Sequence, residues 1–128
     1  MRQILFFIQL FFVPVAVTAQ QDTLRHEHQL RLPVSEKQAG YEDRITQQPY
    51  EVSSFEFYVP DSCRVFIVVR SENDSLDVRI GSKTIRKKAK QEGKYVYSFT
   101  GQLPKGINEL EIRTRKYCQY TIYLKGQL

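Results

Sequence analysis

The sequence predicts an all-β protein, an antiparallel β-sandwich of about seven or eight strands that follows a cleaved signal peptide. From Tyr50 onward, almost every segment alternates apolar and polar residues, as half-buried strands do. Turn residues interrupt this pattern at intervals of roughly ten positions, a spacing typical of sandwiches. No long segment has the 3.6-residue period of an amphipathic helix.

The first 19 residues predict a secretory signal peptide. Arg2 gives a positive start, and Ile4 to Val17 form an apolar block of 14 residues. This block is shorter than the roughly 20 residues that a membrane span needs, and Pro14 interrupts it. An uncleaved N-terminal membrane helix is the alternative. We therefore expect a secreted or periplasmic mature chain of 109 residues, starting near Gln20, with no transmembrane segment.

The mature chain divides into two unequal parts. Residues 20–28 are polar and typical of a frayed end. Leu30 to Val34 could form a short strand, which Pro33 would confine to the edge of a sheet. Ser35 to Pro49 has weak periodicity and is typical of a long connection. We expect residues 20–49 to be an extended segment packed on the core, and residues 50–128 to form the sandwich.

Alternation assigns the strand residues of the sandwich to an inner and an outer face. The segment from Val65 to Val69 is apolar throughout, so Phe66 and Val68 face outward and need a cover. That cover is either the segment from Leu24 to Ile45 or a binding partner. The residues expected to face the core are Phe55, Phe57, Val59, Val65, Ile67, Val69, Leu76, Val78, Ile80, Tyr95, Tyr97, Phe99, Leu110, Ile112, Tyr120, Ile122 and Leu124.

The two cysteines, Cys63 and Cys118, both lie in the mature part. An even number of cysteines in a secreted chain predicts a disulfide. Two unpaired, buried thiols are the alternative. There is no C-x-x-C motif to suggest redox chemistry or a metal site.

Positive charge is concentrated in one stretch. Without the signal peptide the chain has 18 Lys and Arg against 14 Asp and Glu, a net charge of +4, while residues 83–94, KTIRKKAKQEGK, carry a net charge of +5. This stretch is either a short helix over residues 84–93 or a charged hairpin loop. Its clustered cations could bind a phosphate, sulfate or carboxylate polymer, or serve only to keep a loop soluble. The candidate ligand-binding residues are Arg86, Lys87, Lys88 and Lys90, with Tyr95 and Tyr97 stacking on sugars if they are not part of the core.

The order of features from Phe55 to Gly126 resembles the bacterial pre-peptidase C-terminal domain, a family of jelly-roll modules appended to secreted peptidases. The resemblance lies in FEFYVPDS, RVFIVVRSENDSLDVRI, LPKGINELEI and YTIYL. It implies that the first and last of these strands are antiparallel neighbours, which would bring Cys63 close to Cys118. It also implies a role in secretion or in contact with a polymeric surface.

Residues that could support catalysis are scarce. The only histidines, His26 and His28, lie near the mature N-terminus and could hold a metal only if a strand fixed them. The acidic loop could bind calcium or be a solvated turn, and Asn73 begins a formal glycosylation sequon. The loop oxygens would come from Glu72, Asn73, Asp74 and Asp77. We expect no catalytic residues, no metal and no cofactor.

These observations predict a non-enzymatic binding or accessory module at the cell envelope. Its expected partner is an anionic polysaccharide or a lipid headgroup, bound through the basic stretch, and not nucleic acid. The alternative is an accessory subunit or inhibitor that binds an envelope protein through the apolar face at Phe66 and Val68.

Overall fold

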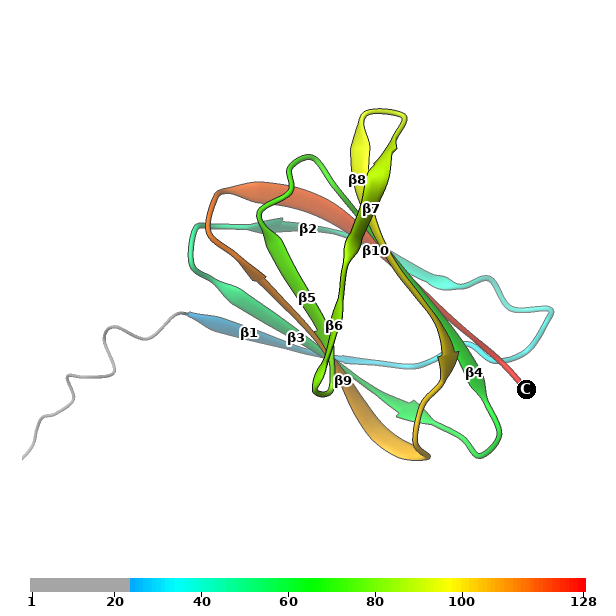
Figure 1. Ribbon diagram of the computed structural model, residues 1–128. Coiled ribbons are helices and arrows are strands. Elements are labelled where there is room, and N and C mark those ends of the chain that lie inside the picture. Colours follow the sequence, from blue (N-terminus) through cyan, green and yellow to red (C-terminus); the bar gives the residue numbers. More distant parts are fainter. Residues whose placement is uncertain (1–23) are drawn as a thin grey trace, which may run out of the picture.

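The computed structural model describes residues 24–128, except for the side chains of residues 87–89. This part of the chain contains ten strands in two sheets that pack face to face (Figure 1). The predicted all-β sandwich is therefore confirmed. No helix in the described part is long and apolar enough to cross a membrane. The expected signal peptide, residues 1–19, lies outside the described residues.

Each sheet has five strands, and every pair is antiparallel except β1 with β3. The first sheet, called sheet A here, has the order β1-β3-β9-β5-β6. Its strands are β1 (Arg25–Leu30), β3 (Val52–Val59), β9 (Gly106–Thr114), β5 (Leu76–Ile80) and β6 (Lys83–Ile85). The second, sheet B, has the order β2-β10-β4-β8-β7. Its strands are β2 (Tyr41–Gln47), β10 (Cys118–Gln127), β4 (Arg64–Ser71), β8 (Lys94–Gln102) and β7 (Lys87–Gln91).

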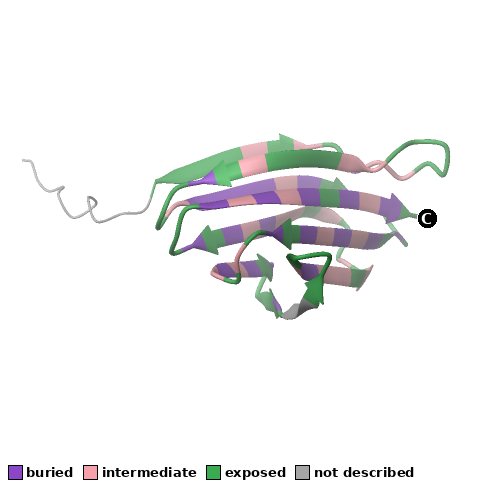
Figure 2. Ribbon diagram, turned by 90° about the horizontal axis from the view of Figure 1, so that it is seen from above, coloured by how far each residue is buried: buried purple, intermediate pink, exposed green. Residues whose placement is uncertain are grey.

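The core lies between the sheets, and alternation along the strands builds it as expected. Buried and partly exposed residues follow each other along the central strands (Figure 2). In β4, for example, Val65, Ile67 and Val69 are fully buried while Phe66 and Val68 are only half-buried. The inward sets predicted for β3, β5, β9 and β10 are all buried. The most enclosed large side chains include Phe55, Leu110, Ile112, Ile122 and Leu124.

The N-terminal segment differs from the expectation of a frayed end and a long connection. Residues 25–30 form β1, an edge strand paired in parallel with β3, and residues 41–47 form β2, an edge strand paired with β10. Both strands are rich in charged residues, which hides the two-residue period. The side chain of His28 faces the core, because its ring stacks on that of Phe55 with 4.6 Å between centroids.

The connection between β1 and β2 crosses from one sheet to the other and is fixed at several points. The amide of Gly126 donates to the carbonyl of Pro33 at 2.7 Å. The ammonium of Lys125 donates to the carbonyls of Ser35 and Gln38. A Cβ on Gly40 would lie 2.4 Å from the Tyr123 ring, so a larger residue here would force the ring to shift. The loop therefore covers one end of the outer face of sheet B.

The basic stretch forms no helix; the alternative of a charged hairpin is the correct one, although most of its residues lie in strands and not in a loop. Residues 83–85 form β6 in sheet A, and residues 87–91 form β7 in sheet B, so the chain changes sheets at Arg86. A two-residue turn then joins β7 to β8. Its residues Glu92 and Gly93 have φ of 51° and 80°, the left-handed values that a type I′ hairpin turn requires.

The expected disulfide is wrong, because Cys63 and Cys118 are free, buried thiols. The first and last strands of the resembling region are not neighbours: β3 lies in sheet A, while β10 lies in sheet B between β2 and β4. In the β4–β10 ladder Arg64 pairs with Gln127, and Ser71 pairs with Tyr120. The two cysteines therefore sit near opposite ends of this ladder, about 25 Å apart at the usual rise per residue, far beyond the reach of a disulfide.

A buried side-chain amide joins the two sheets at the end of β2. Gln47 is completely enclosed. Its Oε1 accepts hydrogen bonds from the hydroxyls of Tyr120 (2.6 Å) and Ser53 (2.9 Å). Its Nε2 donates to the carbonyls of Glu51 (2.7 Å) and Ile112 (3.1 Å). All four bonds available to the amide are made. Burial also raises the pKa of the Tyr120 hydroxyl, which keeps that donor protonated.

Replacing Gln47 with Leu should lower the free energy of unfolding by about 2–4 kcal/mol, because it leaves buried carbonyls and hydroxyls without partners. The measurement is chemical denaturation of the variant beside Gln102→Leu, which changes an exposed glutamine of β8 and should shift stability by less than about 0.5 kcal/mol. Equal effects of the two substitutions would contradict the role given to Gln47.

Candidate functional site

The outer faces of the two sheets carry opposite charge. Residues facing outward from sheet A are mainly acidic: Glu27, Glu56, Asp77, Glu109 and Glu111, against Arg25, Arg79 and Arg113. Residues facing outward from sheet B are mainly basic: Arg44, Arg64, Arg70, Lys94 and Lys125, against Glu42. Positive charge is therefore also found on the outer face of sheet B, outside the stretch from Lys83 to Lys94.

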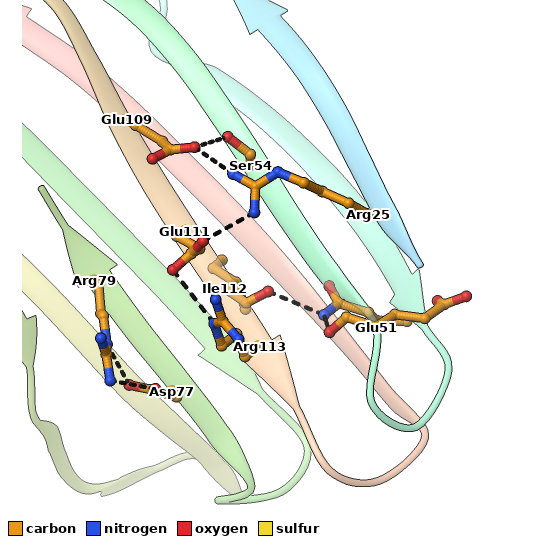
Figure 3. A network of polar contacts seen from close by, with 10 residues as sticks. Arg25, Glu51, Ser54, Asp77, Arg79, Glu109, Glu111, Ile112 and Arg113 are labelled. Carbon is orange, nitrogen blue, oxygen red and sulfur yellow. Dashed lines mark hydrogen bonds and ion pairs between the residues drawn. The ribbon is translucent and has the colours of Figure 1, made fainter. Parts of the chain in front are cut away.

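The arginines of sheet A are held by carboxylates of the same face (Figure 3). Arg25 forms ion pairs with Glu109 at 2.7 Å and with Glu111 at 3.1 Å. Arg113 pairs with Glu111 at 3.4 Å, and Arg79 pairs with Asp77 at 3.2 Å. These positive charges are neutralised within the protein. The outer face of sheet A is thus a network of local pairs across β1, β9 and β5.

Glu111 lies at the centre of this network. Its side chain is only 17% exposed. Burial by itself would raise the pKa of this carboxyl, but hydrogen bonds from Arg25 and Arg113 and their charges outweigh burial and hold the pKa below its usual value. Glu111 therefore stays ionised at neutral pH and keeps both arginines occupied.

Arg44 and Arg70 on sheet B differ from the arginines of sheet A. Among the described residues, neither guanidinium has an ion pair or a side-chain hydrogen bond. Both residues pair with Thr121 of β10, Arg44 from β2 and Arg70 from β4. The two arginines thus lie in one cross-strand row on either side of a threonine, with their charges available to a ligand.

Two adjoining hollows lie around this row. The first has a volume of about 290 Å³ and is lined by Arg44, Arg70, Glu72, Gln91, Glu92, Lys94, Gln119, Tyr120 and Thr121. The second has a volume of about 330 Å³ and is lined by Glu42, Val68, Arg70, Thr121 and Tyr123. Arg70 and Thr121 belong to both hollows, so the two hollows adjoin, and together they are called the sheet B groove below.

The residues chosen from the basic stretch are not gathered into one site. Arg86 lies where the chain changes sheets and lines a hollow beside Asp74 and Tyr97, not the sheet B groove. The ammonium of Lys90 lies 4.9 Å from the centroid of the Tyr95 ring. The side chains of Lys87 and Lys88 lie outside the described residues. The stretch reaches the groove through Gln91, Glu92 and Lys94 at the β7–β8 turn.

Tyr97 is not available for stacking on a sugar. It is 3% exposed, and burial raises the pKa of its hydroxyl to about 12. Its ring belongs to the core, as the alternation of β8 also predicts. Tyr95 is half-buried on the same side of β8 and is partly covered by Lys90. The exposed aromatic ring of the groove is instead Tyr123, which is 36% exposed.

Phe66 and Val68, which were expected on the outer face of sheet B, lie there and are partly covered. Phe66 is half-buried and pairs with Lys125, while Val68 is half-buried and lines the groove. A more exposed apolar pair lies on sheet A, where Tyr58 (50% exposed) faces Ile107 (69% exposed) across β3 and β9. Beside it, Leu30, Leu32, Val34, Tyr58 and Pro60 contribute to a further hollow.

The other candidate ligand residues have partners within the protein. Asn73 Oδ1 accepts from the amide of Ser75, and its Nδ2 donates to the carbonyl of Tyr117. His26 lies 3.4 Å from a carboxylate oxygen of Glu51. Among residues 24–128, no three His, Cys, Asp or Glu side chains are grouped to hold a metal ion. The acidic loop is thus organised as a turn.

Sequence reasoning did not find Arg44, Thr121 or Tyr123 as site residues. Alternation already placed Thr121 and Tyr123 on the outer face of their strand, and the same rule places Arg70 outward from β4. Arg44 could not be placed, because its segment has no apolar alternation that predicts a strand. Which outward residues become neighbours depends on strand order, which alternation does not give.

Comparison with solved structures finds the same fold in bacterial proteins of other sequence. The pre-peptidase C-terminal domain of a Bacillus anthracis collagenase aligns with a TM-score of 0.57 and 10% identity, over 81% of this chain and 99% of that one. A periplasmic inhibitor of g-type lysozyme from Aeromonas hydrophila aligns with a TM-score of 0.55 and 7% identity, over 80% and 99%. Its counterpart from Salmonella Typhimurium gives 0.51 and 12%, over 77% and 97%.

The resemblance to pre-peptidase C-terminal domains is thereby confirmed for the fold. No family model and no curated protein sequence matches the chain. At these identities the likeness concerns the path of the backbone and not the residues of a site.

Replacing Glu111 with Gln should lower the free energy of unfolding at neutral pH and make it depend less on pH in the acid range. A carboxyl whose pKa is lowered by folding stabilises the protein fully above its unfolded pKa, and this contribution is lost as the pH falls through the folded pKa. The variant should lose about 1 kcal/mol at neutral pH and show a flatter decline below about pH 5. Denaturation curves across this range test it, with Glu36→Gln in an exposed turn as the control; parallel declines would contradict the assignment.

Proposed function

We propose that this protein is a secreted or periplasmic, non-enzymatic binding module that captures a polyanionic polymer through the outer face of sheet B. The observation that supports this most directly is the pair of guanidinium groups of Arg44 and Arg70. Among the described residues, neither guanidinium has a carboxylate partner, whereas Arg25, Arg79 and Arg113 on the outer face of sheet A all have one. Their charge can therefore be neutralised by a ligand.

The distribution of charge supports a polymer more than a single ion. Lys94 lines the same groove as the two arginines, and Arg64 lies farther along the same face. Charges spread over one face raise the local concentration of a polyanion and speed its association. Interactions of this kind are screened by salt. The carboxylates on the outer face of sheet A repel a polyanion, so the polymer docks on sheet B only.

A non-enzymatic role is supported by the state of the reactive side chains. Cys63 and Cys118 are buried, with their sulfur atoms 3.3 Å and 3.6 Å from the carbonyl oxygens of Arg64 and Gln119. His28 stacks on Phe55, and His26 faces Glu51. None of these four side chains lines the sheet B groove. The groove offers charges and hydroxyls to a ligand, which suits binding.

The proposed compartment rests on the N-terminal sequence, whose short apolar block after Arg2 is typical of a cleavable signal. The similar structures include periplasmic inhibitors and a domain of a collagenase. The inhibitors of this fold are periplasmic proteins, which is consistent with the proposal.

Removing three positive charges from the groove should abolish most polyanion binding. For Arg44→Gln/Arg70→Gln/Lys94→Gln we expect the affinity for dextran sulfate at low salt to fall by about tenfold or more, because close ion pairs are lost. Binding by the natural protein should also weaken steeply with added salt.

The matched control is Lys105→Gln/Arg115→Gln/Lys116→Gln, which removes the same charge from exposed turns at the ends of the strands. This control should retain binding within about twofold. Equal losses in the two triple variants, or binding that resists salt, would refute capture by the outer face of sheet B.

A second candidate function is inhibition or accessory binding of an envelope protein. The observation that favours it is the exposed pair of Tyr58 and Ile107 next to the hollow of Leu30 and Pro60. Exposed aromatic and aliphatic side chains beside a hollow are typical of protein–protein contact sites. Two structures of similar fold are inhibitors of g-type lysozyme, which supplies a specific enzyme to test.

If this second function holds, the purified protein inhibits a g-type lysozyme, and Tyr58→Ser/Ile107→Ser reduces the inhibition by about tenfold or more because anchoring apolar contacts are lost. The measurement is the rate of cell-wall lysis with increasing inhibitor. The groove triple variant serves as the control and should inhibit normally. No inhibition by the natural protein would remove this lysozyme as the partner.

A further inference from the structure

We propose that the sheet B groove is a subsite for an acidic sugar, with its carboxylate held between Arg44 and Arg70 and its ring packed on Val68 and Tyr123. This inference rests on the proposed function and specifies the repeating unit of the captured polymer. It is carried by the arrangement of four outward positions on three neighbouring strands.

The carboxylate end of the subsite follows from the row through Thr121. Neighbouring strands are about 4.8 Å apart, so the backbones of Arg44 and Arg70 are roughly 10 Å apart with Thr121 between them. Threonine is too short to fill the space between two arginines, and the first hollow opens there. Guanidinium forks suit planar carboxylates, and the threonine hydroxyl adds a third donor.

The two guanidinium groups are free for this purpose. On sheet A every outward arginine has a carboxylate within 3.4 Å. On sheet B the acidic residues nearest the row, Glu42 and Glu72, form no described ion pair with Arg44 or Arg70. A ligand carboxylate therefore displaces no internal partner when it binds.

The ring end lies one step along the same strands. Val68 and Tyr123 are a cross-strand pair, two residues from Arg70 and Thr121 and on the same face. Two residues of strand span about 7 Å, so a ring attached to the carboxylate reaches this pair. The Tyr123 ring lies against Gly40, where a Cβ would force the ring to shift. The loop thus holds the ring in place, and its remaining exposed surface can receive the apolar face of a sugar.

The acidic residues around the groove narrow the choice of anion. Glu42 lines the ring end, where its carboxylate can accept hydrogen bonds from hydroxyl groups. Glu72 and Glu92 line the other hollow. Beside the two guanidinium groups, these three carboxylates add hydrogen-bond acceptors for hydroxyl groups of a ligand. They suit a ligand that carries one negative charge per unit and several hydroxyls, which is the chemistry of a uronic acid.

The experiment measures binding of a galacturonic acid tetramer by titration calorimetry, beside its carboxyl-reduced neutral counterpart. We expect the acidic tetramer to bind at least tenfold more tightly. Arg44→Gln and Arg70→Gln should each weaken its binding by about tenfold or more, and Tyr123→Leu should weaken both tetramers. Arg64→Gln removes a charge from the same face outside the groove and should change binding by less than about twofold.

Arg70→Lys separates this inference from the proposed function. Lysine keeps the charge but lacks the planar fork, so the variant should keep its affinity for dextran sulfate and lose that for the tetramer. Equal binding of the two tetramers, or equal effects of Arg70→Gln and Arg64→Gln, would overturn the uronate subsite while polyanion capture stands. If the protein does not bind the acidic tetramer, and if the groove triple variant binds dextran sulfate as well as the natural protein does, the proposed function is overturned too.

Discussion

The buried amide of Gln47 is the contact on which the arrangement of the candidate face depends. It closes the end of β2 with four hydrogen bonds that reach β10, β3 and the backbone of β9. Because β2 is an edge strand with few apolar residues, packing alone holds it weakly. Gln47 fixes its position on β10, and three residues earlier Arg44 is thereby placed beside Thr121.

The two outer faces show how a modest net charge can conceal a strongly polar surface. Every second residue of a strand faces outward, and the strand order then decides which of these residues share a sheet. In this protein sheet A collects carboxylates that pair with each of its outward arginines, while sheet B collects arginines and lysines with few acids. Among the described residues, the outward arginines of sheet A are therefore paired with carboxylates, while Arg44, Arg64 and Arg70 of sheet B are not.

The fold itself does not determine what the protein binds. Structures that share it with this chain at identities of 7–12% include a collagenase domain and lysozyme inhibitors, and one sandwich supports many surfaces. The case for a binding face thus depends on particular side chains: Arg44 and Arg70, which have no ion pair among the described residues, and a Tyr123 ring that lies against Gly40.

The sequence by itself determined the all-β class and the inward and outward residues of β3, β4, β5, β8, β9 and β10, because alternation is a local property that each strand carries in its own residues. Strand order was decided only by the tertiary structure, since pairing joins residues far apart in the chain. Pairing with β3 and β10 makes residues 25–30 and 41–47 strands. The strand order also keeps Cys63 far from Cys118 and places Arg44 and Arg70 on either side of Thr121.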